Sequence, residues 1–224
     1  MLLVIAVGGE MDAALGGLLG AGASIGRPGL WERREAGRCV DVVLCGVGKA
    51  NAAAATARAI DPVRHGVVLS AGVCGALPGS GLVTGDAVAA TRSVNADEGI
   101  ALPGGGFESC TEMGFPTTFA RDAVPADPAV VDELARVCDA QGPIATVSTC
   151  SGTDALALGV ASRTGALVEA MDGAAAGRVA EVMGVAFGEV RVVSNQTGDR
   201  DKQVWDLPRA FARLGEVLGR LASG

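Results

Sequence analysis

Residues 189–205 read EVRVVSNQTGDRDKQVW, and the fold prediction starts from this stretch. Its apolar first half predicts a strand that ends at Ser194 and Asn195, followed by a polar loop that contains Arg200 and Asp201. Strand ends that lead into polar loops are where α/β enzymes hold their reactive groups. We therefore expect Asn195 to lie at a binding site.

The amide of Asn195 carries one hydrogen-bond acceptor and two donors. This combination suits a 6-oxopurine, which presents a carbonyl oxygen beside the ring nitrogen N7. An aspartate at this position would suit a 6-aminopurine better. The residue type thus indicates a purine contact at the strand end.

Strand-like and helix-like segments alternate along the chain, which predicts a layered α/β sheet in a single domain over residues 1–224. Several apolar runs are continuous, as expected for strands covered on both faces. The glycine-rich and proline-rich segment 95–124 shows weak periodicity, and loops of this length are usually functional. The expected strands cover residues 2–7, 40–45, 67–71, 87–92, 144–148, 166–169 and 186–194, and the expected helices cover 10–19, 51–60, 128–140, 153–162, 173–183 and 208–221.

Composition narrows the class of protein. The 224 residues carry a net charge of −7 without a basic stripe, which argues against a nucleic-acid partner. The apolar run at the amino terminus is too short for a membrane span or a signal segment, so we expect a cytoplasmic protein with no membrane contact.

The cysteines are irregularly spaced and the chain has one histidine, His65. A zinc site built from clustered cysteine and histidine is therefore not expected, and most of the six cysteines are predicted to be reduced, partly buried thiols. We place His65 on a solvated loop, because it follows a turn-like segment and precedes an apolar strand.

Two glycine-rich strand ends, 43–51 and 70–78, offer close backbone approach to a ligand. The first matches neither a dinucleotide fingerprint nor a phosphate-binding loop. It is more often a structural turn, and the second is equally compatible with a turn or a site. Gly72, Val73 and Cys74 are the candidates there.

Acidic residues follow two of the expected strands. Glu10 and Asp12 come after the first strand, where they are either helix first-turn acids or groups that activate water. Asp172 follows Met171 and precedes a helix, so it is either a helix cap or an acceptor for the vicinal hydroxyls of a ribose. Both roles can coexist.

The order of these motifs resembles the nucleoside phosphorylase and nucleosidase superfamily, and within it most closely the futalosine hydrolase family. The resemblance covers nearly the whole chain. It implies a three-layer α/β/α sandwich with a mixed, partly barrel-like central sheet, in a homo-oligomer (dimer or tetramer) whose neighbouring chain can complete the pocket. The implied reaction is hydrolysis of the N-glycosidic bond of futalosine to hypoxanthine and dehypoxanthine futalosine, a step of menaquinone biosynthesis. The resemblance implies no metal and no organic cofactor.

The resemblance also implies roles for individual residues. Asn195 contacts N7 and O6 of the leaving purine, Asp12 activates water with Glu10 as the rival, and Asp172 binds the ribose hydroxyls with Met171 against the sugar. The segment 95–119 recognises a benzoate-bearing 5′ extension. The remaining candidates are Gly72, Val73 and Cys74 on the ribose side, Cys150 and Ser151 in the loop 149–154 beside the base, and Arg200 and Asp201, which order the loop after the last strand.

Three alternatives stay open. A 5′-methylthioadenosine/S-adenosylhomocysteine nucleosidase usually carries aspartate at the position of Asn195. A purine nucleoside phosphorylase needs arginine to grip phosphate, and only Arg27 keeps that reading open. A non-catalytic nucleoside-binding relative is permitted by Asp12 and Asp172, because related nucleosidases carry the longer glutamate at these positions.

Overall fold

The computed structural model describes the chain except residues 21–24, 38, 116–120 and 224. Its described residues form a nine-stranded mixed sheet in the order β10-β9-β5-β11-β4-β1-β3-β2, with β8 paired to β5. A short hairpin of β6 and β7 lies apart from it. The strands are β1 (Leu2–Ile5), β2 (Arg33–Glu35), β3 (Asp41–Leu44), β4 (Val67–Ala76), β5 (Ala87–Asn95), β6 (Gly99–Ala101), β7 (Phe107–Ser109), β8 (Ala123–Pro125), β9 (Ala140–Thr146), β10 (Val168–Ala170) and β11 (Ala186–Gln196).

Part of the sheet closes on itself. Strand β10 pairs in parallel with β9 and antiparallel with β4, so that β4, β11, β5, β9 and β10 form a closed ring of strands. Strands β1, β3 and β2 extend from β4 as an open, largely parallel sheet. The predicted mixed, partly barrel-like sheet is confirmed.

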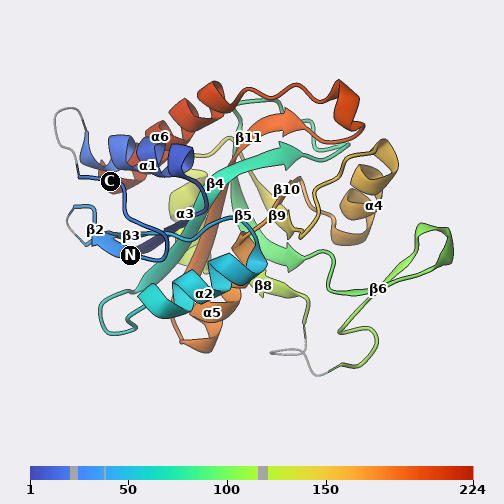
Figure 1. Cartoon of the computed structure of the whole chain (residues 1–224), viewed down its shortest axis with the longest axis horizontal. Helices are drawn as coiled ribbons and strands as arrows, with labels where there is room; N and C mark the ends of the chain where they lie inside the picture. The colour runs from blue at the N-terminus through green and yellow to red at the C-terminus, as the bar shows by residue number, and fades with distance from the viewer. Residues whose placement is uncertain (21–24, 38, 116–120, 224) are drawn as a thin grey trace.

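Helices cover both faces of the sheet (Figure 1). Leu3 and Ile5 of β1 pack with α1 and α6, whereas Leu2 and Val4 pack toward α2 and α5. This alternation along one strand buries both faces, which explains the continuous apolar runs. The helices are α1 (Gly8–Leu19), α2 (Lys49–Ala59), α3 (Pro128–Ala135), α4 (Asp154–Thr164), α5 (Gly173–Val182) and α6 (Leu207–Ser223).

Most predicted elements are present, with two notable changes in length. The helix predicted over 128–140 ends at Ala135, and β9 begins at Ala140. The side chain of Asp139 accepts a hydrogen bond from the Ala87 backbone N–H at 2.9 Å, which fixes the start of β9 against β5. Strand β4 runs to Ala76 rather than residue 71, because its second half pairs with β11 and β10 inside the closed ring.

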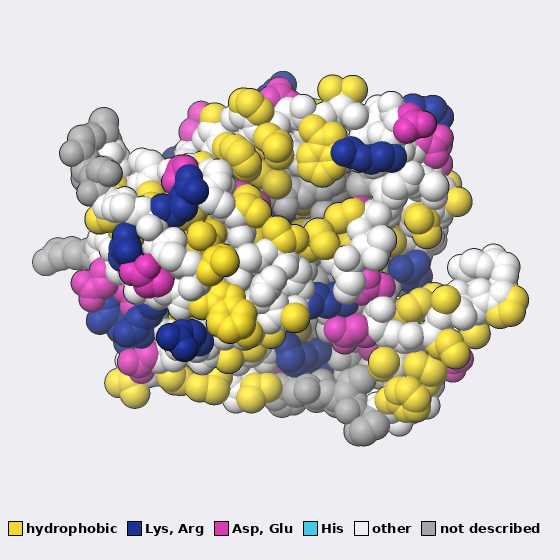
Figure 2. All heavy atoms as spheres, in the orientation of Figure 1, with side chains coloured by type: hydrophobic (Ala, Val, Ile, Leu, Met, Phe, Trp, Pro, Cys, Tyr) yellow, Lys and Arg dark blue, Asp and Glu magenta, His cyan; other side chains and the backbone are white. Residues whose placement is uncertain are grey.

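On the face drawn in Figure 2, basic and acidic side chains are interspersed. No helix in the described part of the chain is long and apolar enough to cross a membrane. The six cysteines are free thiols.

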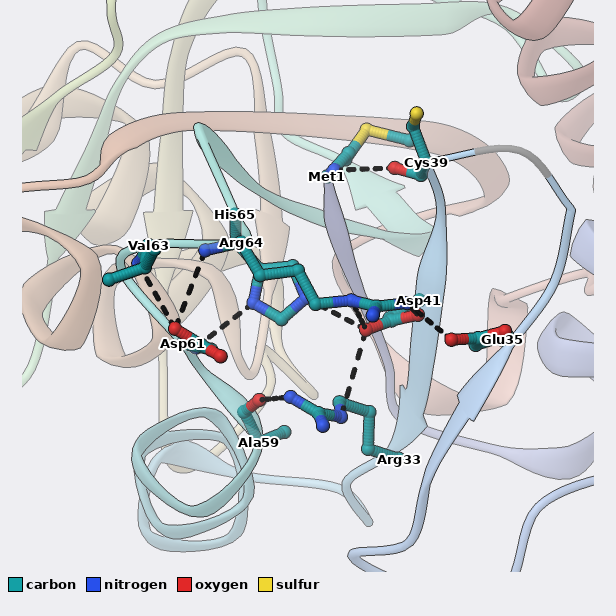
Figure 3. A network of polar contacts seen from close by, with 10 residues as sticks. All are labelled: Met1, Arg33, Glu35, Cys39, Asp41, Ala59, Asp61, Val63, Arg64 and His65. Carbon is teal, nitrogen blue, oxygen red and sulfur yellow. Dashed lines mark hydrogen bonds and ion pairs between the residues drawn. The ribbon is translucent and has the colours of Figure 1, made fainter.

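The prediction that His65 lies on a solvated loop is wrong. His65 is 1% exposed, and its Nε2 lies 2.9 Å from Oδ2 of the buried Asp41 (Figure 3). The ring Nδ1 accepts a hydrogen bond from the Asp61 backbone N–H at 3.0 Å, so a proton on Nε2 completes the pairing with Asp41. Arg33 and Arg64 also pair with Asp41. This network connects the loop after α2 to the beginning of β3. His65 is buried because it pairs with Asp41, an acid that is far away in sequence.

Candidate active site

Polar side chains from several elements meet near the carboxyl ends of β1, β4, β10 and β11. Strands β4 and β11 run in parallel, with Arg191 beside Gly72 and Asn195 beside Gly75. The polar side chains of β11 therefore lie next to the glycine-rich second half of β4. Figure 2 shows the surface hollowed below the segment that follows β11. The carboxyl edge of an α/β sheet is where ligands bind in such folds.

Glu10 enters this cluster from the first turn of α1. Its side chain is buried, and its two carboxylate oxygens accept hydrogen bonds from the backbone N–H of Val7 at 3.1 Å and of Val73 at 2.8 Å. Burial raises the pKa of Glu10, and the nearby Arg191 partly opposes that rise. Glu10 is therefore both a first-turn acid of the helix and a carboxylate joined to β4.

Asp12 lies outside the cluster. Residues two apart on a helix point to nearly opposite sides, and the Asp12 side chain is 56% exposed. It accepts a hydrogen bond from Nε of Arg27 at 3.0 Å. The structure thus pairs the two residues with each other at the surface, and brings only Glu10 to the expected site.

Asp172 occupies the position before α5, but its side chain does not cap that helix. Thr146 accepts a hydrogen bond from the Ala174 N–H at 2.9 Å instead. The buried Asp172 carboxylate accepts from the Gly48 N–H at 2.7 Å and lies 3.5 Å from Nη1 of Arg191. The first glycine-rich strand end therefore contributes a backbone donor to the site.

Gly72 is required where Glu10 and Arg191 approach each other. A Cβ atom at Gly72 would lie 2.5 Å from Oε1 of Glu10 and 2.7 Å from Nη1 of Arg191. Such distances are far below normal contacts, so a side chain here would displace both charged groups. Val73 and Cys74, the other candidates of this strand, follow directly, with Val73 half-buried and Cys74 buried.

The sequence motifs assigned no role to Arg191 or Glu189. Both are buried in the middle of β11, and Arg191 reaches Glu189, Ser70 and Asp172. Their signal in the sequence is two opposite charges inside an otherwise apolar strand. A buried charge is costly unless it is paired, so this pattern indicates an internal ion pair.

Asn195 is 2% exposed near the end of β11. The register with β4 shifts between Val193 and Asn195, and such a bulge redirects the following side chain. Oδ1 accepts from Oγ of Ser194 at 2.9 Å, and Nδ2 donates to the Gln196 carbonyl at 3.0 Å. Within the part of the chain that the structure describes, one N–H and one lone pair of the amide remain for a ligand.

The loop before α4 is held by Glu169 from β10. Both the backbone N–H and the hydroxyl of Ser151 donate to Glu169, each at 2.7 Å. Burial raises the pKa of Glu169, and these two hydrogen bonds oppose the rise. Cys150 is exposed beside Ser151, and Met171 is half-buried next to Asp172.

The loop after β11 docks onto this segment. Gln203 donates to the Ser151 carbonyl at 3.0 Å, and the Arg200 backbone N–H donates to the Gly152 carbonyl at 3.0 Å. The Arg200 guanidinium lies 5.5 Å from the centre of the Trp205 ring, and Asp201 is exposed. The two loops thus support each other beside the candidate site.

Comparisons with known proteins agree with this architecture. The phosphorylase superfamily model matches residues 3–223. A futalosine hydrolase from Acidothermus cellulolyticus is 38% identical over 229 residues, with 99% of this chain and 90% of the relative covered. A futalosine hydrolase from Streptomyces coelicolor is 35% identical over 233 residues, with 99% and 94% covered.

Solved structures share the fold. The 5′-methylthioadenosine/S-adenosylhomocysteine nucleosidase from Neisseria meningitidis superposes with a TM-score of 0.78 at 20% identity, covering 99% of this chain and 98% of that one. The S-adenosylhomocysteine nucleosidase from Streptococcus pyogenes gives a TM-score of 0.76 at 21% identity, covering 98% and 94%. The chain belongs to the phosphorylase superfamily and, within it, to the futalosine hydrolase family.

Proposed function

We propose that the protein hydrolyses the N-glycosidic bond of futalosine and releases hypoxanthine and dehypoxanthine futalosine, a step of menaquinone biosynthesis. The observation that carries this proposal is the buried amide of Asn195, which lies near the same edge of the sheet as two buried carboxylates, Glu10 and Asp172. The amide suits a 6-oxopurine, and the two acids suit a sugar and a water molecule. Membership in the futalosine hydrolase family supports the same substrate.

Asn195 acts on the leaving group. Cleavage leaves negative charge on the purine, and a positioned donor stabilises such charge in the transition state. The second N–H of Asn195 donates to O6, and its carbonyl oxygen accepts from N7 once solvent water has protonated that nitrogen. The bonds to Ser194 and Gln196 hold the amide in place for this contact.

Asp172 and Met171 bind the ribose. The sugar gains oxocarbenium character as the bond breaks, so a carboxylate near its hydroxyls stabilises the developing positive charge. Asp172 accepts from the ribose 2′- and 3′-hydroxyls, and Met171 lies against the sugar face. Gly72, Val73 and Cys74 line the ribose side, with Gly72 leaving room for Glu10 and Arg191.

Glu10, rather than Asp12, is our choice for the residue that activates water. A general base works best when its pKa approaches the working pH, and burial raises the pKa of Glu10 toward that range. Asp12 is ion-paired with Arg27 at the surface. The same pairing weakens phosphorolysis as an alternative, because Arg27 is the arginine on which it depended.

The remaining residues shape the site. Cys150 and Ser151 flank the base, and Arg200 and Asp201 order the loop after β11, where Arg200 lies over Trp205. We propose that the protein forms a homo-oligomer, a dimer or tetramer, in which a neighbouring chain covers the candidate site. Exposed apolar side chains near the end of β3 support such an interface: Leu30 is 70%, Val47 46% and Trp31 39% exposed.

A cavity of about 530 Å³ next to the site suits the benzoate-bearing 5′ extension. Asn95 and Glu98 of the segment 95–119 line it, together with Lys49, Arg121 and Arg178, whereas residues 116–119 lie outside the described part of the chain. Lys49 directly follows Gly48, which binds Asp172, so the cavity adjoins the proposed ribose site. Asp122 also lines the cavity, and the cations there are already paired, Lys49 with Asp97 and both arginines with Glu181. A carboxylate of the substrate would join these ion pairs.

Replacing Arg178 with glutamine should raise the KM for futalosine about tenfold or more, because a charge-assisted hydrogen bond to the carboxylate is lost. The inhibition constant of inosine, which lacks the extension, should stay the same. Arg58→Gln, on the far end of α2, is the matched control. Equal weakening of inosine and futalosine would place the extension elsewhere.

The proposed reaction is tested by incubating the protein with futalosine, inosine and methylthioadenosine, each with and without phosphate, and identifying the base released. Hypoxanthine from futalosine without phosphate is the expected result. Adenine release would select a methylthioadenosine nucleosidase, a phosphate requirement would select a phosphorylase, and tight binding without turnover would select a non-catalytic relative.

A further inference from the structure

Glu189 is a buried acid beneath the site that the proposed chemistry does not use. Its side chain has no exposed surface, although it lies in the middle of β11. One carboxylate oxygen accepts a hydrogen bond from Nε of Arg191 at 2.8 Å, and the other accepts from the hydroxyl of the buried Ser93. A carboxylate that two side chains hold in the interior has a defined position, and water does not compete for its hydrogen bonds.

The carboxyl group of Glu189 also lies against the first residue of α5, Gly173. A Cβ atom at Gly173 would overlap with it, so the glycine makes room for the acid. The positive end of the α5 dipole favours a negative charge at this place. Since Asp172 does not cap α5, Glu189 is the acid that lies under the helix start.

Arg191 connects Glu189 to the two proposed active-site acids. Its Nη2 donates to Oγ of Ser70 at 2.8 Å, and its Nη1 lies 3.5 Å from Oδ2 of Asp172. The same Nη1 shares the space above Gly72 with the Glu10 carboxylate. Three carboxylates therefore surround one guanidinium, and the short ion pair is the one to Glu189.

We propose that Glu189 is a positioning residue that holds the Arg191 guanidinium beneath Asp172 and Glu10 and takes up part of its positive charge. The inference rests on the proposed function, in which Glu10 activates water. Glu189 and Ser70 keep Arg191 from closing onto Glu10 as a tight ion pair. A tight pair would stabilise the ionised form of Glu10 and weaken it as a base.

Glu10 also interacts with groups other than Arg191. Asp172 contributes a second negative charge, and the N–H groups of Val7 and Val73 donate to Glu10. The thiols of Cys45 and Cys74 are close enough to interact, but burial raises the pKa of both, that of Cys45 to about 12. These thiols are neutral near pH 7. Among the described residues, Arg191 is the cation that interacts with Glu10.

The test is the pH dependence of kcat/KM for futalosine in Glu189→Gln. Without the negative charge of Glu189, the positive charge of Arg191 stabilises ionised Glu10 more strongly and lowers its pKa. The acidic limb of the profile should therefore move to lower pH by about half a unit to one unit. We expect kcat to fall while KM stays within about twofold, since the ribose contacts remain. Ser70→Ala removes the second anchor of Arg191 and should move the limb in the same direction by less.

Val192→Ala is the matched control, a neighbouring buried position on β11 that carries no charge. It should lower the thermal unfolding temperature and leave the acidic limb in place. If Glu189→Gln does not fold, Ser70→Ala decides the question. Limbs that coincide with that of the natural protein in both variants would overturn the inference.

Direct titration of Glu10 by ¹³C NMR reads the same shift without any turnover. This titration separates the two proposals. If the protein releases no hypoxanthine from futalosine, the proposed function is contradicted but the positioning role of Glu189 is not. If the pKa of Glu10 is the same in Glu189→Gln as in the natural protein, the positioning role of Glu189 is contradicted, whatever the substrate is.

Discussion

Replacing Asn195 with alanine should lower kcat/KM for futalosine by about 100- to 1000-fold, the usual cost of losing one donor that acts on charge in the transition state. The fold should persist, because among the described residues the amide bonds only to Ser194 and to the Gln196 carbonyl. Steady-state kinetics with hypoxanthine detection measures the loss, and thermal unfolding checks the fold. The main effect should fall on kcat, since the contact strengthens as the base departs.

The neighbouring Gln196→Ala is the control for this experiment. Gln196 is exposed and donates to the Leu82 carbonyl, so its loss should leave turnover close to that of the natural protein. Near-normal turnover in Asn195→Ala would remove the amide from the leaving-group role and with it the argument for a 6-oxopurine.

Replacing Glu10 with glutamine should lower kcat by about 100-fold or more, with little change in KM, because a general base contributes at least that factor. The natural protein should lose activity as the pH falls through the raised pKa of Glu10, since the protonated acid cannot accept a proton from water. This acidic limb should vanish in the glutamine variant. A pH–rate profile measures both effects.

Asp12→Asn is the matched control for Glu10. Asp12 lies two residues further along the same helix, at the surface, and should tolerate the change with normal kinetics. A large fall in kcat for Asp12→Asn, with Glu10→Gln unaffected, would return the water-activating role to Asp12.

The layered fold could be predicted from the sequence because burial on both faces leaves continuous apolar runs, such as those of β1 and β3. Closure of the sheet through β10 was expected from the family resemblance rather than from local pattern. The pairing of Val168 with Ala76 joins segments far apart in the chain, and no periodicity encodes it. The early end of α3 depends in the same way on a contact between Asp139 and Ala87.

The sequence motifs predicted which strand ends form the site. They did not predict which side chain of each motif faces the site. Glu10 and Asp12 are both acids in one helix turn, and the helix start at Gly8 decides which one faces inward. The roles of Arg191 and Glu189 depend on contacts with Ser70, Ser93 and Asp172, which lie far away in sequence and cannot be read from a local pattern. His65 is buried for the same kind of reason, through a distant acid.

The most direct test of the account is the reaction of futalosine in phosphate-free buffer made with ¹⁸O-labelled water. We predict that hypoxanthine is released and that one ¹⁸O atom appears on the anomeric carbon of the dehypoxanthine futalosine formed. Release that requires phosphate, or no release while futalosine binds, would contradict the claim that this buried cluster is the active site of a nucleoside hydrolase.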